Sequence, residues 1–76
     1  MLAHIHFQRK DGTWSVILRK NFNVLVSWIK RGDIVALNAD TLTVEEAERL
    51  YKEGIHLIPD EKIIGNQIIK ILRVEG

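Results

Sequence analysis

Residues 4–19 read HIHFQRKDGTWSVILR, and this stretch predicts a β-hairpin centred on Asp11-Gly12. Alternating runs flank the dipeptide on both sides, and Asp-Gly is typical of a two-residue turn in which both residues take positive φ. A type I′ turn of this kind pairs Lys10 with Thr13 and thereby sets the register of the whole hairpin.

This register predicts one packed face and one polar face. On the packed face, Ile5 and Phe7 lie opposite Leu18 and Val16, with Trp14 near the turn. We expect the other face to meet solvent or a partner. Its members are His4, His6, Gln8, Lys10, Thr13, Ser15, Arg19 and one large apolar residue, Ile17.

A first helix is predicted after the hairpin, with Asn21 or Asn23 as its N-cap. It ends at Lys30-Arg31-Gly32, because cations suit the last turn and glycine suits the left-handed position that follows. Trp28 falls beside the apolar stripe, so we expect it to be partly exposed. The stripe itself consists of Phe22, Leu25, Val26 and Ile29.

A second helix is predicted over residues 44–53. Thr43 and Glu46 form a capping box at its start, and Gly54 closes it. We expect its acidic side to point outward. Its apolar stripe consists of Val44, Ala47, Leu50 and Tyr51.

Further strands complete the predicted sheet. A short buried strand covers 34–37, and another at 55–58 stops at Pro59-Asp60. Gly65-Asn66 is typical of a type II′ turn and leads into a strand at 67–74, with a terminal helix from Asn66 as the alternative. The last strand is apolar on both sides, so we expect it inside the sheet or with one edge covered by another subunit.

The order of these elements predicts a small single α+β domain over 1–76, β-β-α-β-α-β-β, with two helices packed on a mainly antiparallel sheet. Without Cys, neither a disulfide nor a thiolate metal site can add stability. The chain lacks a signal-peptide start and an apolar run that could span a bilayer, so we expect a cytoplasmic protein. One Met and 28% charged residues favour a heat-adapted source, with a virus or mobile element as the candidate origin.

Charges are sorted along the chain. Residues 1–38 carry six basic and two acidic side chains, and residues 39–76 carry five basic and eight acidic ones, so the halves are +4 and −3. A basic surface on a small domain favours an anionic partner, nucleic acid first. The hairpin strands are about 20 Å long, so the basic doublets cannot form one patch. These doublets are Arg9-Lys10, Arg19-Lys20 and Lys30-Arg31.

Side chains for catalysis or metal binding are sparse. His4 and His6 lie two apart on one strand face, a spacing that suits two metal ligands, but no third ligand accompanies them. Ser15 and Ser27 lie in no nucleophile motif, and each glycine stands alone rather than in a phosphate-binding loop. We therefore expect no enzymatic activity, no catalytic residue, no cofactor and no metal.

The first functional hypothesis is a non-enzymatic nucleic-acid-binding domain that contacts the phosphate backbone of DNA or RNA through the polar hairpin face. Trp14 and Trp28 add aromatic surface for stacking. The alternative is a protein-interaction module (a subunit, adaptor or inhibitor) that docks on a partner or on a second copy. Neither hypothesis involves a membrane or a small-molecule substrate. The expected nucleic-acid contacts are Lys10, Arg19, His6, Gln8, Lys20, Lys30 and Arg31.

Overall fold

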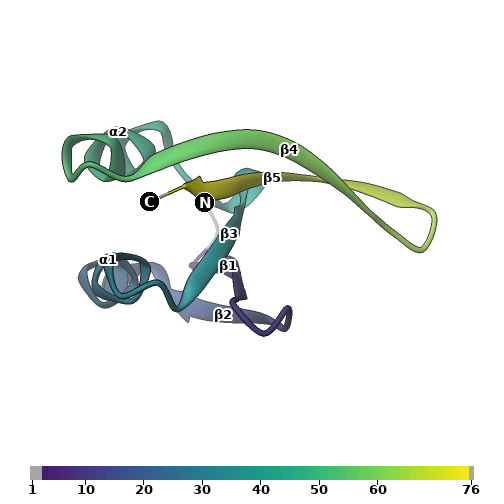
Figure 1. The fold of residues 1–76 in the computed structure, drawn as a ribbon, viewed down its shortest axis with the longest axis horizontal. Helices are drawn as coiled ribbons and strands as arrows, with labels where there is room; N and C mark the ends of the chain where they lie inside the picture. Colours follow the sequence, from purple (N-terminus) through teal and green to yellow (C-terminus); the bar gives the residue numbers. More distant parts are fainter. Residues whose placement is uncertain (1–2, 76) are drawn as a thin grey trace.

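The computed structural model describes residues 3–75, which form a five-stranded antiparallel sheet with two helices packed on one face (Figure 1). The strand order is β2-β1-β3-β5-β4. The predicted α+β class and the β-β-α-β-α-β-β order are confirmed. The elements are β1 (His4–Arg9), β2 (Trp14–Leu18), the 3-10 turn η1 (Arg19–Asn21), α1 (Phe22–Lys30), β3 (Ile34–Asn38), the 3-10 turn η2 (Ala39–Thr41), α2 (Val44–Lys52), β4 (His56–Ile64) and β5 (Gln67–Glu75).

The core lies between the sheet and the two helices. Ile5, Phe7 and Leu37 of the sheet are almost inaccessible to solvent, as are Leu25 of α1 and Leu50 of α2. Burial of these large apolar side chains supplies the main favourable term for folding. The other members of the core are Ile17, Phe22, Val26, Ile29, Ile34 and Ile55.

The hairpin forms where predicted, but the predicted register is wrong by one residue. Its connection has three residues rather than two, because the N–H of Gly12 donates to the Arg9 oxygen and the N–H of Arg9 donates to the Thr13 oxygen, each at 2.8 Å. Within residues 3–75 positive φ is confined to glycines, so Asp11 does not take the left-handed conformation of a type I′ turn. Its carboxylate instead accepts hydrogen bonds from the N–H and hydroxyl of Thr13, at 3.0 and 2.7 Å. These bonds stabilise a type I turn followed by a glycine bulge.

This shift exchanges the two faces of β2. Ile17 pairs with Ile5 and enters the core, whereas Val16 and Leu18 lie exposed on the outer face, opposite the two histidines of β1. A slip of one residue moves every side chain of a strand to the other side of the sheet. Trp14 pairs with Gln8 and lies on the outer face with Val16 and Leu18. The predicted packed face of β2 and the predicted face with a single large apolar residue are therefore both wrong.

α1 follows its prediction closely. Asn21 occupies the N-cap position, although its side chain makes no capping hydrogen bond. Gly32 takes a φ of +84°, and the N–H of Asp33 donates to the Trp28 carbonyl at 3.0 Å, so the helix ends as its sequence indicates. Trp28 is partly exposed, as predicted.

α2 begins at the predicted capping box. The Thr43 hydroxyl accepts from the Glu46 N–H at 3.1 Å, and the Glu46 carboxylate accepts from the Thr43 N–H at 2.9 Å. The predicted apolar stripe is only partly buried, because Leu50 lies in the core while Val44 and Tyr51 are 71% and 72% exposed. Within residues 3–75, neither α1 nor α2 is long and apolar enough to cross a membrane.

β4 runs unbroken through Pro59 to Ile64, so the predicted stop at Pro59-Asp60 is wrong. β4 is the edge strand of the sheet, where proline is tolerated because its missing N–H can face away from the neighbouring strand. The segment after Asn66 is a strand rather than a helix. β5 lies between β3 and β4 as predicted, but only Ile71, Leu72 and Arg73 pair with strands on both sides. Gly65 takes a φ of +61° in the two-residue connection between β4 and β5.

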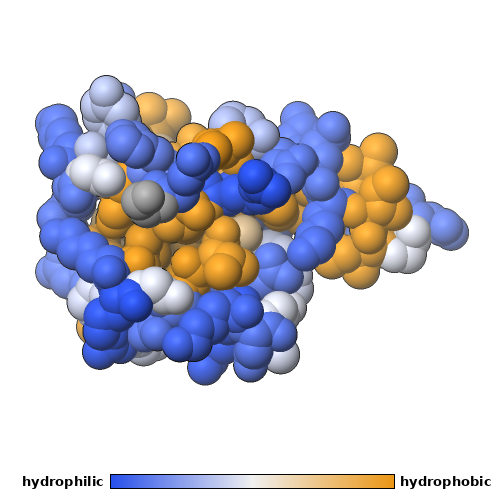
Figure 2. All heavy atoms as spheres, viewed as in Figure 1, coloured by the Kyte–Doolittle hydropathy of each residue, from blue (hydrophilic) through white to orange (hydrophobic). Residues whose placement is uncertain are grey.

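The hairpin of β4 and β5 extends past the rest of the sheet. β3 pairs with β5 only at Ile71, Leu72 and Arg73, so residues 61–70, which we call the arm, form a two-stranded ribbon that projects from the body (Figure 1). Apolar side chains gather towards the projecting end (Figure 2). Ile63, Ile64 and Ile68 are the exposed large apolar residues there.

Candidate nucleic-acid interface

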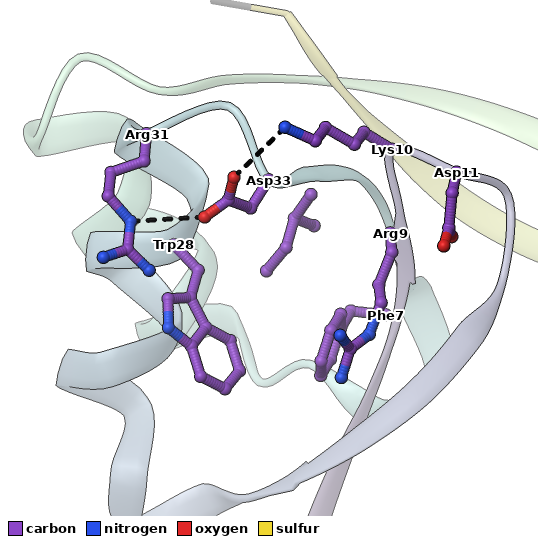
Figure 3. Close-up of a pocket in the computed structure, with 8 residues that line it drawn as sticks. Phe7, Arg9, Lys10, Asp11, Trp28, Arg31 and Asp33 are labelled. Carbon is purple, nitrogen blue, oxygen red and sulfur yellow. Dashed lines mark hydrogen bonds and ion pairs between the residues drawn. The ribbon is translucent and has the colours of Figure 1, made fainter.

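A cavity of about 380 Å³ lies where the turn of the β1–β2 hairpin meets the C-terminal end of α1 and the start of β3 (Figure 3). Antiparallel pairing of β1 with β3 places Arg9 opposite Ile34 and so brings these segments together. The aromatic and charged side chains that carry its chemistry are Phe7, Arg9, Lys10, Trp28, Arg31 and Asp33.

Two aromatic rings form one part of the cavity wall. The ring centroids of Phe7 and Trp28 are 5.8 Å apart, and the rings are tilted by 53°, a favourable arrangement for an aromatic pair. The guanidinium carbon of Arg9 lies 5.9 Å from the centroid of Phe7, within the range of a cation–π contact. Phe7 is buried and Trp28 is partly exposed, so Trp28 is the ring that a ligand can reach.

Charged side chains form the rim of the cavity. The carboxylate oxygens of Asp33 lie 3.7 Å from Nζ of Lys10 and 3.2 Å from Nε of Arg31 (Figure 3). One carboxylate therefore holds cations from two separate segments on the same side of the opening. The side chains of Lys10 and Arg31 remain 70% and 63% exposed. Exposed ion pairs are weak, so both cations can turn towards another anion.

The lining of the cavity is electropositive. Arg9, Lys10 and Arg31 stand against Asp11 and Asp33, so three positive and two negative charges leave a net charge of +1. Hydrogen bonds from the N–H and hydroxyl of its turn neighbour lower the pKa of the Asp11 carboxyl. This carboxylate is thus ionised at neutral pH and already satisfied within the turn.

Arg19, an expected nucleic-acid contact, lies between the hairpin and α2 instead. Its guanidinium bonds the carboxylate of Glu46 and the carbonyl oxygen of Thr41. The side chains of Arg19 and Glu46 are 17% and 13% exposed, so both charges are largely removed from water. The acidic side of α2 therefore does not point wholly outward, and Arg19 links two elements of the fold.

Lys20 and Lys30 lie outside the cavity lining. Nζ of Lys30 lies 2.6 Å from a carboxylate oxygen of Glu53, beyond the last turn of α2. This hydrogen bond and the Lys30 charge lower the pKa of the Glu53 carboxyl. Lys20 is exposed in η1, at the opposite end of α1. Ion pairs between the basic first half and the acidic second half of the chain therefore neutralise part of the charge difference within the fold.

His6 and Gln8 also lie away from the cavity. Gln8 is buried, and its Nε2 donates to the Gly12 carbonyl at 3.1 Å, so it closes the hairpin turn. Residues 3–75 contain no group of three His, Cys, Asp or Glu side chains that could hold a metal ion. His6 lines a separate hollow on the outer face of the sheet, together with Trp14, Asn38, Ile64 and Ile69.

Of the seven expected contacts, the structure brings Lys10 and Arg31 to one cavity. It adds Arg9 and places it beside Trp28, an expected stacking surface, although β2 and most of α1 separate the two residues in the chain. The sequence does place Arg9 at the end of β1 and Trp28 near the end of α1, just before β3. Antiparallel pairing of β1 with β3 brings these two positions together. In comparisons with known proteins, the chain matches no family model, no curated protein and no solved structure.

Proposed function

We propose that this protein is a small non-enzymatic nucleic-acid-binding domain whose contact surface is centred on the cavity. The observation that carries this proposal is the convergence of Arg9, Lys10 and Arg31 beside a partly exposed Trp28. Cations of this kind contact phosphates, and an accessible aromatic ring contacts a base or a sugar.

The state of the two carboxylates supports binding over catalysis. Asp33 is engaged by Lys10 and Arg31, and Asp11 is engaged by Thr13. Each carboxylate thus already serves as an acceptor for protein groups, whereas a general base must reach a proton of the substrate. We also propose a cytoplasmic location, because a chain without Cys needs no oxidising compartment.

Fluorescence anisotropy with labelled DNA and RNA tests this function. We expect binding at low salt that weakens as salt rises from 50 to 200 mM, about sevenfold for a single strand and about twelvefold for a duplex, because phosphate contacts by Lys10 and Arg31 give slopes of about −1.4 and −1.8. Arg31→Ala should weaken binding. Lys62→Ala, which removes a cation from the arm, should leave binding unchanged. No binding by about 50 µM protein at low salt would contradict the proposal.

The arm favours a second candidate function, docking onto another protein or onto a second copy of the chain. Ile63 and Ile68 pair across the two strands and are 75% and 66% exposed. A two-stranded ribbon is marginally stable in water by itself, and exposed apolar patches often mark contact surfaces. A partner that covers this face would stabilise the arm.

Light scattering after size exclusion tests the second candidate. We expect the wild-type protein to form dimers, and the double variant Ile63→Ser/Ile68→Ser to remain a monomer. The control variant Val44→Ser/Tyr51→Ser removes two similarly exposed apolar side chains from α2 and should still form dimers. A monomeric wild type at high concentration would exclude self-association and leave only a different protein as the partner.

A further inference from the structure

We propose that the cavity captures one unpaired nucleotide of a single strand, with its base against Trp28 and its phosphate at Lys10 and Arg31. This inference rests on the proposed nucleic-acid function and adds the class of ligand. It predicts a preference for single strands over duplexes. It also predicts that Trp28, rather than Trp14, reports binding.

The aromatic and cationic walls suit a flat, electron-rich ligand. Trp28 stands on one side of the cavity, and the guanidinium of Arg9 stands on the other, beside Phe7 (Figure 3). Both an indole and a planar guanidinium stack on nucleobases, because every base offers a π face. Phe7 is buried and contacts both groups, with its ring centroid 5.8 Å from that of Trp28 and 5.9 Å from the guanidinium carbon of Arg9.

The rim places two cations where the phosphate of such a nucleotide would lie. Lys10 comes from the hairpin turn, Arg31 follows α1, and Asp33 contacts both side chains (Figure 3). Asp33 compensates only one of the two charges. One positive charge of the rim is therefore left to attract a phosphate, and the phosphate need not displace the Asp33 carboxylate.

The shape of the site favours an unpaired base. In a duplex both faces of a base are covered by its neighbours, so a recessed aromatic wall cannot reach them. A single strand can place one base in the cavity and lead its backbone along the basic rim.

Tryptophan fluorescence tests the proposal, because the chain contains only two Trp residues. In the Trp14→Phe protein, a 12-nucleotide single strand should quench the remaining emission, and the 12-base-pair duplex should not. The Trp28→Phe protein, whose only Trp is on the outer face of the hairpin, serves as the matched control and should show no quenching. Trp28→Ala should weaken single-strand binding by about 5- to 150-fold, the contribution of one stacked base, and should leave duplex binding unchanged.

The outcomes separate this inference from the function on which it rests. Equal binding of single strand and duplex with unchanged Trp28 emission would overturn base capture and leave phosphate binding intact. No binding of either nucleic acid would overturn both. A mononucleotide such as AMP that binds as tightly as the strand would assign the cavity to free nucleotides and overturn the strand as its ligand.

A charge variant tests where the phosphate lies without touching the aromatic wall. Asp33→Asn removes the negative charge at the rim and should tighten single-strand binding by about 1.5- to 5-fold at low salt, the range of one exposed ion pair. Asp40→Asn makes the same change of net charge in η2, away from the cavity, and should have a smaller effect. Equal effects of the two variants, or weaker binding by Asp33→Asn, would overturn the placement of the phosphate at this rim.

Discussion

The helix-covered face of the sheet and the arm are both rich in Ile, yet their surroundings are opposite. Ile5, Ile17 and Ile34 lie in the core, whereas Ile63 and Ile68 lie on a projecting ribbon and are largely exposed. β-branched residues favour strands in both places. The contrast shows that a strand-forming sequence does not determine its own burial, which depends on the elements that reach it.

The difference has a geometric cause. β5 is nine residues long, but the neighbouring β3 has five residues and pairs with only three of them. The helices have nine residues each; α1 packs against β2 and β3, and α2 packs against β4 at the end of the sheet away from the arm (Figure 1). Nothing within residues 3–75 extends far enough to cover both faces of the arm.

Removing an apolar side chain from each region gives the largest expected contrast. Leu37→Ala should lower the free energy of unfolding by about 2–5 kcal/mol, because Leu37 is fully buried and its removal leaves a cavity. Ile68→Ala should change it by less than about 0.5 kcal/mol, because its side chain already meets water. Chemical denaturation at low protein concentration measures both. A large loss for Ile68→Ala would mean that the arm is covered in solution.

The ion pair between Arg19 and Glu46 should have the next largest effect. Glu46→Gln keeps a side chain that can serve the capping box and removes only the charge. We expect a loss of about 1–3 kcal/mol, because the guanidinium of Arg19 would stay largely buried beside a neutral partner. Glu48→Gln, an exposed change on the same helix, is the control for thermal denaturation. Equal melting temperatures of the two variants would contradict the importance of this pair.

The two hairpin turns offer a matched comparison of smaller size. Gly12 and Gly65 both take positive φ, and a Cβ at either position would meet no atom within 4 Å. Gly12→Ala should therefore cost about 1 kcal/mol of global stability through backbone strain alone. Gly65→Ala should cost less, because the tip of the arm can fray without opening the core. Hydrogen exchange of the arm amides should still be faster in Gly65→Ala than in the wild type. An equal loss of global unfolding free energy in Gly12→Ala and Gly65→Ala would argue against independent fraying of the arm.

The pH dependence of the hairpin turn should be the smallest effect. Hydrogen bonds from Thr13 lower the pKa of Asp11 in the folded protein, so the turn gains stability above the ordinary pKa near 4. This contribution should disappear as the pH falls through the lower folded value. The wild type should therefore lose stability towards pH 2 more steeply than Asp11→Asn in thermal scans. Parallel curves would show that these hydrogen bonds contribute nothing.

Most elements of the fold could be predicted because their signals are local. Thr43 and Glu46 lie one helical turn apart and satisfy each other, and Gly32 ends α1 by its own backbone conformation. The predicted stop at Pro59 failed because proline breaks a strand only where its N–H is needed, and an edge strand does not need it. That condition depends on strand order, which no local pattern contains.

The candidate site was less predictable than the fold. The sequence predicts Lys10 and Arg31 as contacts, but it places Arg19 on the same surface because the expected register turns Arg19 towards solvent. Arg9 joins Trp28 at one site only when β1 pairs with β3 and α1 packs on that sheet face. The number of charges can be counted from the sequence, but which side chains surround each charge depends on pairing between distant segments.

The sequence by itself determined the type and order of most strands, helices and turns, because capping, helical spacing and glycine conformation act over a few residues. Tertiary structure decided which of these residues face one another. The hairpin register followed from a three-residue turn together with the burial of Ile17, two contributions that must agree with each other. The cavity beside Trp28 and the exposed arm followed in turn from strand pairing and strand length. Such long-range contacts are selected by the free energy of the whole fold, and no single stretch of sequence contains them.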